Sequence, residues 1–119
     1  MIDDYPLFVH WYRTLDWILV AVERFPKSAR FSLASRIADL ALDAMELIIE
    51  AIYTRERGHI LDQLNLYMEK LRVLFRIAHH RRYLSNAQYE FIAKAVNEAG
   101  RMAGGWRKHA DATRRPSFS

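Results

Sequence analysis

Residues 70–88 read KLRVLFRIAHHRRYLSNAQ. Up to residue 82 the apolar side chains recur at every third or fourth position, which is typical of an amphipathic α-helix. Ser85 and Gln88 then stand three residues apart at the start of a second apolar repeat, and this spacing indicates a capping box that begins a helix. The stretch therefore predicts two helices joined by a short turn.

The same helical repeat covers most of the remaining chain. It predicts helices over about residues 6–24, from a turn at 25–28 to about 53, over 59–82, and over 85–108. Pro26 supports the first turn, because the residue before a proline is disfavoured in the α region. We therefore expect an all-α protein, an up-down-up-down four-helix bundle over residues 1–109, with a disordered C-terminal tail over residues 110–119.

One face of the first helix is expected to enter the core. The face is defined by apolar positions that recur with helical spacing, and its members are Phe8, Trp11, Tyr12, Leu15, Ile18, Leu19 and Val22.

Composition restricts the class of protein. The chain is 51% hydrophobic and has no cysteine, which excludes disulfides and thiolate metal sites and fits a reducing, cytoplasmic location. The N-terminus carries two acids where a secretion signal has a positive region. The most apolar run, residues 17–22, is far shorter than the roughly 20 residues of a membrane-spanning helix, so we expect no membrane association.

The helices carry more apolar positions than the core of one bundle can use. Large apolar patches that stay exposed usually mark an interface, so we predict a homo-oligomer. Gly100 supports this. A glycine inside a helix destabilises the helix by about 1 kcal/mol relative to alanine, and a close approach of another backbone or of a ring would compensate for that loss. The alternative is a wide core with a few exposed leucines. The candidate interface residues are Trp17, Leu42, Met45, Ile49, Leu66, Val73 and Gly100.

Charge divides the chain into two parts. Residues 1–69 have a net charge of −4 and residues 70–119 a net charge of +8. In an antiparallel bundle the turn after the first helix and the turn after the third lie at the same end, so the cations of both turns could merge. Such a patch would suit RNA, DNA or an acidic protein surface. The candidate binding residues are Arg24, Lys27, Arg30, Arg72, Arg76, His79, Arg81 and Arg82.

Arg81 and Arg82 have a second interpretation. Cations at the C-terminus of a helix stabilise it through the helix dipole, by roughly 0.3–1 kcal/mol each. Arg72 and Arg76 lie too far back along the helix for this explanation.

No pattern of catalytic residues stands out. A metal-binding bundle needs paired Glu-x-x-His motifs, and only Glu56 and His59 match, at a predicted helix break. The acids of the second helix, spaced by three or four, are typical of a solvated stripe. We therefore predict no enzyme activity, no catalytic residue, no cofactor and no metal, and a metal-dependent bundle enzyme remains the alternative.

Several stretches resemble a known family, the accessory variability determinants of diversity-generating retroelements, within a four-helix-bundle group that includes proteins encoded in 23S rRNA intervening sequences. The resemblance spans about residues 5–108. The matching stretches are Trp11-Tyr12, Glu23-Arg24-Phe25-Pro26-Lys27-Ser28, Arg30-Phe31, Glu46-Leu47-Ile48-Ile49-Glu50-Ala51, Glu69-Lys70-Leu71-Arg72, Leu84-Ser85 and Gly100-Arg101-Met102 followed by Gly104-Gly105-Trp106.

The resemblance implies a barrel-like homopentamer that associates with a reverse transcriptase and its template RNA, and possibly with cDNA. It further implies a non-catalytic role in mutagenic cDNA synthesis, with Arg24, Lys27, Arg72 and Arg76 contacting polymerase or RNA. The alternative within the same group is an RNA-associated bundle of the rRNA intervening-sequence type that has no polymerase partner.

Overall fold

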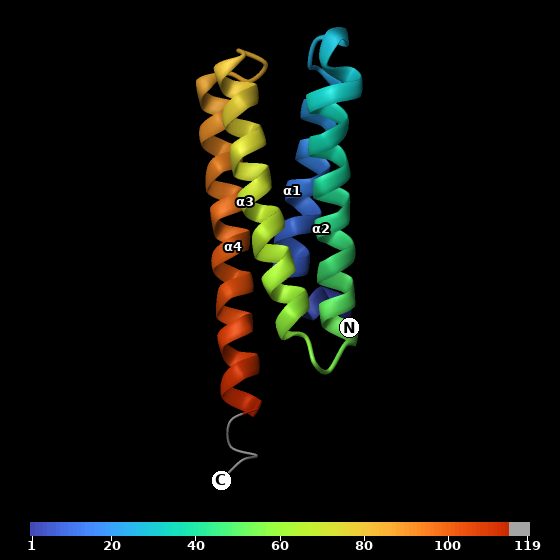
Figure 1. Cartoon of the computed structure of the whole chain (residues 1–119), viewed down its shortest axis with the longest axis vertical. Coiled ribbons are helices and arrows are strands. Elements are labelled where there is room, and N and C mark those ends of the chain that lie inside the picture. The colour runs from blue at the N-terminus through green and yellow to red at the C-terminus, as the bar shows by residue number, and fades with distance from the viewer. Residues whose placement is uncertain (115–119) are drawn as a thin grey trace.

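Four long helices run alternately up and down (Figure 1). The computed structural model describes the backbone of residues 1–114 and the side chains of residues 1–109. The helices are α1 (Pro6–Glu23), α2 (Ser35–Tyr53), α3 (Gly58–His80) and α4 (Asn86–Arg114). The predicted all-α, up-down-up-down four-helix bundle is confirmed.

The capping box at the start of α4 has the geometry that its sequence predicts. The backbone N–H of Ser85 donates to Oε1 of Gln88 at 2.8 Å, and the backbone N–H of Gln88 donates to Oγ of Ser85 at 3.1 Å. Two N–H groups that have no partner within the helix are thereby satisfied. These two residues fix where the turn ends and α4 begins.

The connection between α1 and α2 is longer than the predicted four-residue turn. After Pro26 the chain makes a short 3₁₀ turn (Lys27–Ala29) and then a π-helical turn (Arg30–Ala34), so that regular α-helix starts only at Ser35. The π turn buries Ala34 and leaves Phe31 exposed.

Helix α4 extends beyond the predicted end near Lys108. Its backbone is helical through Arg114, and thus over the first five residues of the predicted tail, whereas residues 115–119 lie outside the described part. The late turns of α4 contact other parts of the chain, although they contain Gly104 and Gly105. The Trp106 ring lies 5.4 Å from that of Tyr5, and Arg107 Nε donates to Asp62 Oδ1 at 3.0 Å.

The face of α1 that enters the core differs from the predicted one. Its buried positions are Leu7, Trp11, Thr14, Ile18 and Ala21, whereas Phe8, Leu15 and Val22 are only partly buried. Trp11 and Ile18 are buried as predicted, and the polar groups on the buried face have hydrogen-bond partners. The Trp11 indole donates to the Ala41 carbonyl at 3.0 Å, and the Thr14 hydroxyl donates to the His10 carbonyl at 2.9 Å.

No helix within the described residues is long and apolar enough to cross a membrane.

Candidate functional site

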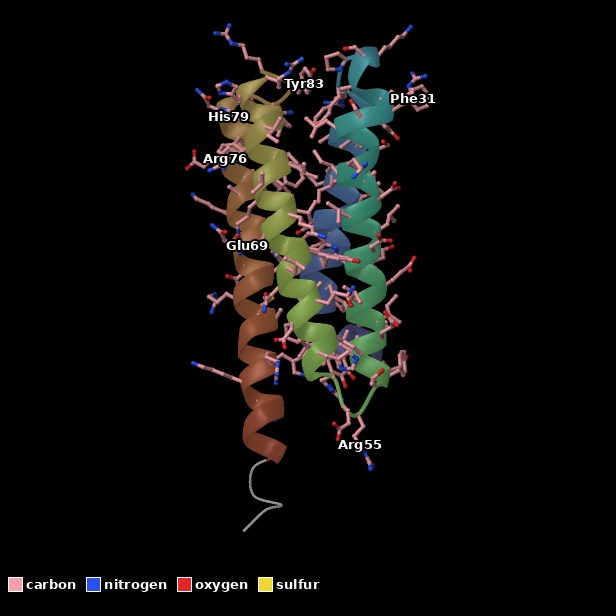
Figure 2. The ribbon with its side chains drawn as sticks, viewed as in Figure 1. Phe31, Arg55, Glu69, Arg76, His79 and Tyr83 are labelled. Carbon is pink, nitrogen blue, oxygen red and sulfur yellow. The ribbon has the colours of Figure 1, made fainter. Side chains whose placement is uncertain are left out.

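Two turns that are far apart in sequence lie at the same end of the bundle (Figure 2). The α1–α2 turn contributes Phe25 and the α3–α4 turn contributes Tyr83, and their ring centroids are 5.4 Å apart. Because Phe25 is buried, the contact ties the tips of the two helical hairpins together. We call this part of the molecule the basic end, and its cations are Arg24, Lys27, Arg30, Arg81 and Arg82.

All five cations of the basic end are exposed. Among residues 1–109 none of these five forms an ion pair. The α1–α2 side of this end also has no carboxylate between Glu23 and Asp39. Positive charge therefore stays uncompensated by the chain itself, which favours an anionic partner.

The α3–α4 turn holds Arg82 in an unusual conformation. The backbone N–H of Tyr83 donates to the Ala78 carbonyl at 2.8 Å, and that of Arg82 donates to the His79 carbonyl at 2.9 Å. This pair of bonds is a Schellman motif, in which the left-handed position is usually glycine. Arg82 occupies that position with φ of 64°.

Tyr83 also contacts one of the cations. The Arg81 guanidinium lies 5.8 Å from the centre of the Tyr83 ring, and its Nη2 donates to the Tyr83 hydroxyl at 3.4 Å. The guanidinium thus stays beside the contact between the two hairpins, where it can meet a ligand that spans both turns.

The sequence predicts that Arg72 is available to bind a partner, but in the structure its guanidinium is already paired. Its Nη1 forms an ion pair with Glu69, and its Nε donates to Asn97 Oδ1 at 2.7 Å. The guanidinium also lies over Gly100, where a Cβ would come within 2.7 Å of Nη2. Arg72 therefore joins α3 to α4.

Arg76, one turn further along α3, is exposed and forms no ion pair among residues 1–109. It lines a groove between α3 and α4 together with Tyr89 and Asn97. Of the two arginines predicted on this face, Arg76 is the one whose charge is available.

His79 is a link between helices. Its ring stacks on Tyr89 of α4, with centroids 4.4 Å apart and planes 6° apart. Its Nε2 donates to Asn86 Oδ1 at 2.7 Å. The ring is half-buried, so His79 shapes the α3–α4 hairpin below the basic end.

The predicted interface residues fall into two groups. Leu42, Ile49, Leu66 and Val73 are between 37% and 52% exposed, and this leaves apolar side chains in solvent along the middle of α2 and α3. The other three predicted interface residues make contacts within the same chain. Met45 is buried in the core, the Trp17 ring lies 5.1 Å from that of Phe91, and Gly100 is covered by Arg72 instead of a backbone or ring.

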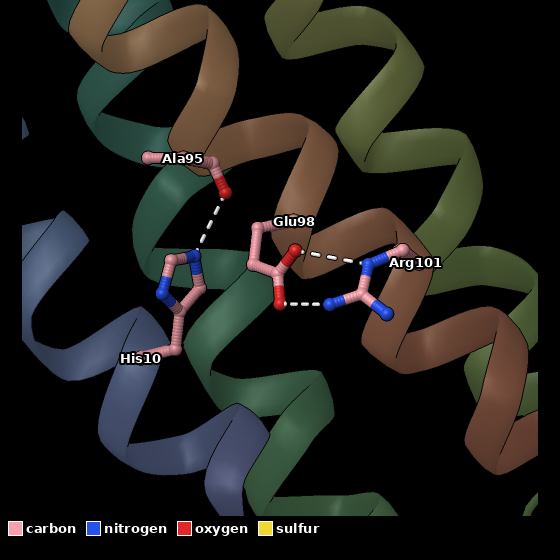
Figure 3. A network of polar contacts seen from close by, with 4 residues as sticks. All are labelled: His10, Ala95, Glu98 and Arg101. Carbon is pink, nitrogen blue, oxygen red and sulfur yellow. Dashed lines mark hydrogen bonds and ion pairs between the residues drawn. The ribbon is translucent and has the colours of Figure 1, made fainter.

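A polar network joins α1 to α4 on the side of the bundle (Figure 3). His10 Nε2 donates to the Ala95 carbonyl at 2.8 Å, while Arg101 Nε donates to Glu98 Oε2 at 3.0 Å. The hydrogen bond from Arg101 holds the pKa of Glu98 below its ordinary value. The network has no nucleophile, and among the described residues no three His, Asp or Glu side chains are grouped to hold a metal ion.

Phe31 is the feature of the basic end that the sequence does not reveal. It is 88% exposed, the most exposed aromatic side chain in the described part of the chain, and it points away from the bundle (Figure 2). If this segment were a regular α-helix, the apolar repeat would indicate whether the side chain of Phe31 is buried or exposed. The π turn changes that register, and no sequence pattern indicates a π turn here.

One comparison with known proteins gives a match. A family model described as bAvd-like matches residues 9–110, which is most of the chain. A search of curated proteins gives no significant match.

Proposed function

Because the chain belongs to the bAvd-like family, we propose that it is a non-enzymatic accessory variability determinant of a diversity-generating retroelement. In this role it binds the element's reverse transcriptase and template RNA and supports mutagenic cDNA synthesis. The family match is the observation that carries the proposal.

The basic end supports the RNA part of this role. Five exposed cations without ion pairs lie on two turns held together by Phe25 and Tyr83. Guanidinium groups donate to phosphate oxygens in a planar, forked geometry, which suits four of these five cations. Release of counterions from the RNA would make the affinity fall steeply with salt.

The exposed apolar positions on α2 and α3 support assembly into a homo-oligomer, for which the family resemblance implies five subunits. Leu42 and Ile49 on α2, and Leu66 and Val73 on α3, repeat at intervals of seven residues, so each pair lies on one helix face. Assembly would present the basic end once per subunit and raise the affinity for a long polyanion.

A co-expression pull-down tests the proposal. The chain is the bait, the reverse transcriptase encoded beside it is the prey, and retention is measured with and without nuclease at about 150 mM salt, where exposed charges are partly screened. The bait is tested as wild type, as Arg81→Glu with Arg82→Glu, and as Arg76→Glu. Lys108→Glu is the matched control, because Lys108 is exposed and distant from the basic end.

We expect the wild type and the control to retain the polymerase and its RNA, and the charge reversals to lose one or both. Retention that survives nuclease identifies a direct protein contact. Failure of the wild type to retain any polymerase would contradict the proposal, and binding of RNA alone would favour the intervening-sequence type of bundle. Arg72→Glu is a poor probe, because it would also place a carboxylate between Glu69 and Asn97.

A further inference from the structure

The side chain of Phe31 is left almost wholly in solvent by the single chain. It is 88% exposed and lies on the π turn, immediately after Arg30. It differs from the exposed apolar residues of α2 and α3, which lie in the middle of the bundle. A single exposed apolar residue is common on protein surfaces, and what distinguishes Phe31 is its place beside the cations of the basic end.

The charge of the residues around Phe31 indicates the kind of ligand that the site would bind. Residues 24–38 contain four cations and no acid, and the adjoining groove is lined by Lys27 and Arg30, with Glu23 as its one carboxylate. A second copy of this chain docking through the same face would bring like charges together, which is unfavourable. A polyanion with an apolar face complements both features of this surface, because its charges suit the cations and its apolar face can cover the ring.

Single-stranded nucleic acid has both properties. Its phosphates meet the cations, and its unpaired bases can stack on an aromatic side chain. In a duplex the base faces are already stacked on one another, so a duplex offers Phe31 no partner. We propose that Phe31 is a base-stacking platform for an unpaired nucleotide at the basic end, with Lys27 and Arg30 contacting the flanking phosphates. This inference rests on the proposed RNA-binding function and specifies which form of RNA the site takes.

The test is a pair of binding titrations by fluorescence anisotropy. The probes are a labelled 20-nucleotide oligouridylate and a labelled RNA duplex of about the same length. The protein is tested as wild type, Phe31→Ala, Phe31→Trp, and Tyr53→Ala. Tyr53 is the matched control, because it is a 74% exposed aromatic residue at the C-terminus of α2, at the opposite end of the bundle.

We expect Phe31→Ala to weaken binding of the single strand by about 5- to 150-fold, the range that loss of one stacked base produces. Binding of the duplex should stay unchanged, and so should the salt dependence, because no phosphate contact is removed. Phe31→Trp should retain the affinity, and Tyr53→Ala should match the wild type. The thermal midpoint of Phe31→Ala should equal that of the wild type, since the ring contacts solvent.

Three results would overturn the inference. The first is equal loss of single-strand and duplex binding, or no loss of either. The second is a change in oligomeric state for Phe31→Ala, which would assign the ring to a contact between copies. The third is loss of polymerase retention by Phe31→Ala in the pull-down, with its RNA binding intact. This result would assign the Phe31 ring to a contact with a protein partner. In each case the proposed function is judged separately, by the charge reversals at Arg81 and Arg82.

Discussion

The Arg72 guanidinium occupies the space beside Gly100 that a side chain would need. A Cβ on Gly100 would come within 2.7 Å of Arg72 Nη2, while Arg72 Nε is hydrogen-bonded to Asn97 one turn earlier on α4. The glycine therefore allows an arginine of α3 to lie flat against α4. This explains a helical glycine for which the sequence alone suggested an oligomer contact.

A double-mutant cycle should reveal the coupling between these two residues. In the wild type, Gly100→Ala should change the free energy of unfolding little, because a helix-propensity gain of about 1 kcal/mol is offset by displacement of the hydrogen bond to Asn97, worth about 1 kcal/mol. In an Arg72→Ala background the same substitution should stabilise by about 1 kcal/mol. Urea unfolding at one fixed protein concentration measures both values. Equal effects in the two backgrounds would refute the coupling.

Arg82→Gly should stabilise the protein. A non-glycine residue in the left-handed region costs about 1–2 kcal/mol, and part of the gain is lost to the greater freedom of glycine in the unfolded chain. We expect a net gain of about 0.5–1 kcal/mol in thermal or urea unfolding. Arg82→Ala is the control, because it removes the same charge but keeps a Cβ, and it should not stabilise. A gain from both variants would show that charge repulsion, and not the backbone, is the cause.

Ser85→Ala should destabilise the protein by about 1 kcal/mol, the usual effect of removing an N-cap hydroxyl. The reason is that the backbone N–H of Gln88 loses its acceptor at the start of α4. Unfolding by urea checks the value. Ser28→Ala, at an exposed position in the α1–α2 turn, serves as the comparison and should be close to neutral. A similar loss in both variants would mean that the capping bonds contribute nothing specific.

The pKa of Glu98 should respond to Arg101. Hydrogen bonding by Arg101 lowers that pKa in the folded protein, so Arg101→Gln should raise it toward its ordinary value. Because the folded pKa is the lower one, the pair stabilises the fold above about pH 4.5, and the contribution is lost as the pH falls through the lowered pKa. Carboxyl NMR titration of both proteins measures the shift. An unchanged Glu98 pKa in the variant would contradict the assigned cause.

The sequence contains enough information for the number, order and direction of the helices, because caps and apolar repeats are local. Pro6 and Ser85 mark helix starts that the structure confirms to within a residue. The buried face of α1 was predicted only in part: Trp11 and Ile18 are buried as expected, but Leu7, Thr14 and Ala21 are buried in place of the other predicted positions. The contacts of this face are with residues far away in sequence, as in the bond from Trp11 to the carbonyl of Ala41, 30 residues away.

The candidate site was predictable in its location but not in its details. Antiparallel topology places the two cationic turns at one end, and the structure shows them there. Which cations are free depends on contacts between helices. Arg72 and Arg76 have the same residue type and differ by one helical turn, yet only Arg72 meets Asn97 and Gly100 on α4. Phe31 was missed because its exposure depends on the π turn.

The π turn at Arg30–Ala34 makes the α1–α2 connection sensitive to length. A π turn holds one more residue per hydrogen-bonded loop than an α turn does. Deleting a single residue there would let the segment relax into a regular helix and would rotate the residues before it by about 100° relative to α2. The ring of residue 31 and the cations beside it would then face a different direction relative to α2, and Phe25 and Ala29 would have to repack against the core. Chain length at this one turn is thus a means by which the proposed binding surface can diverge among bundles that keep the same order of helices.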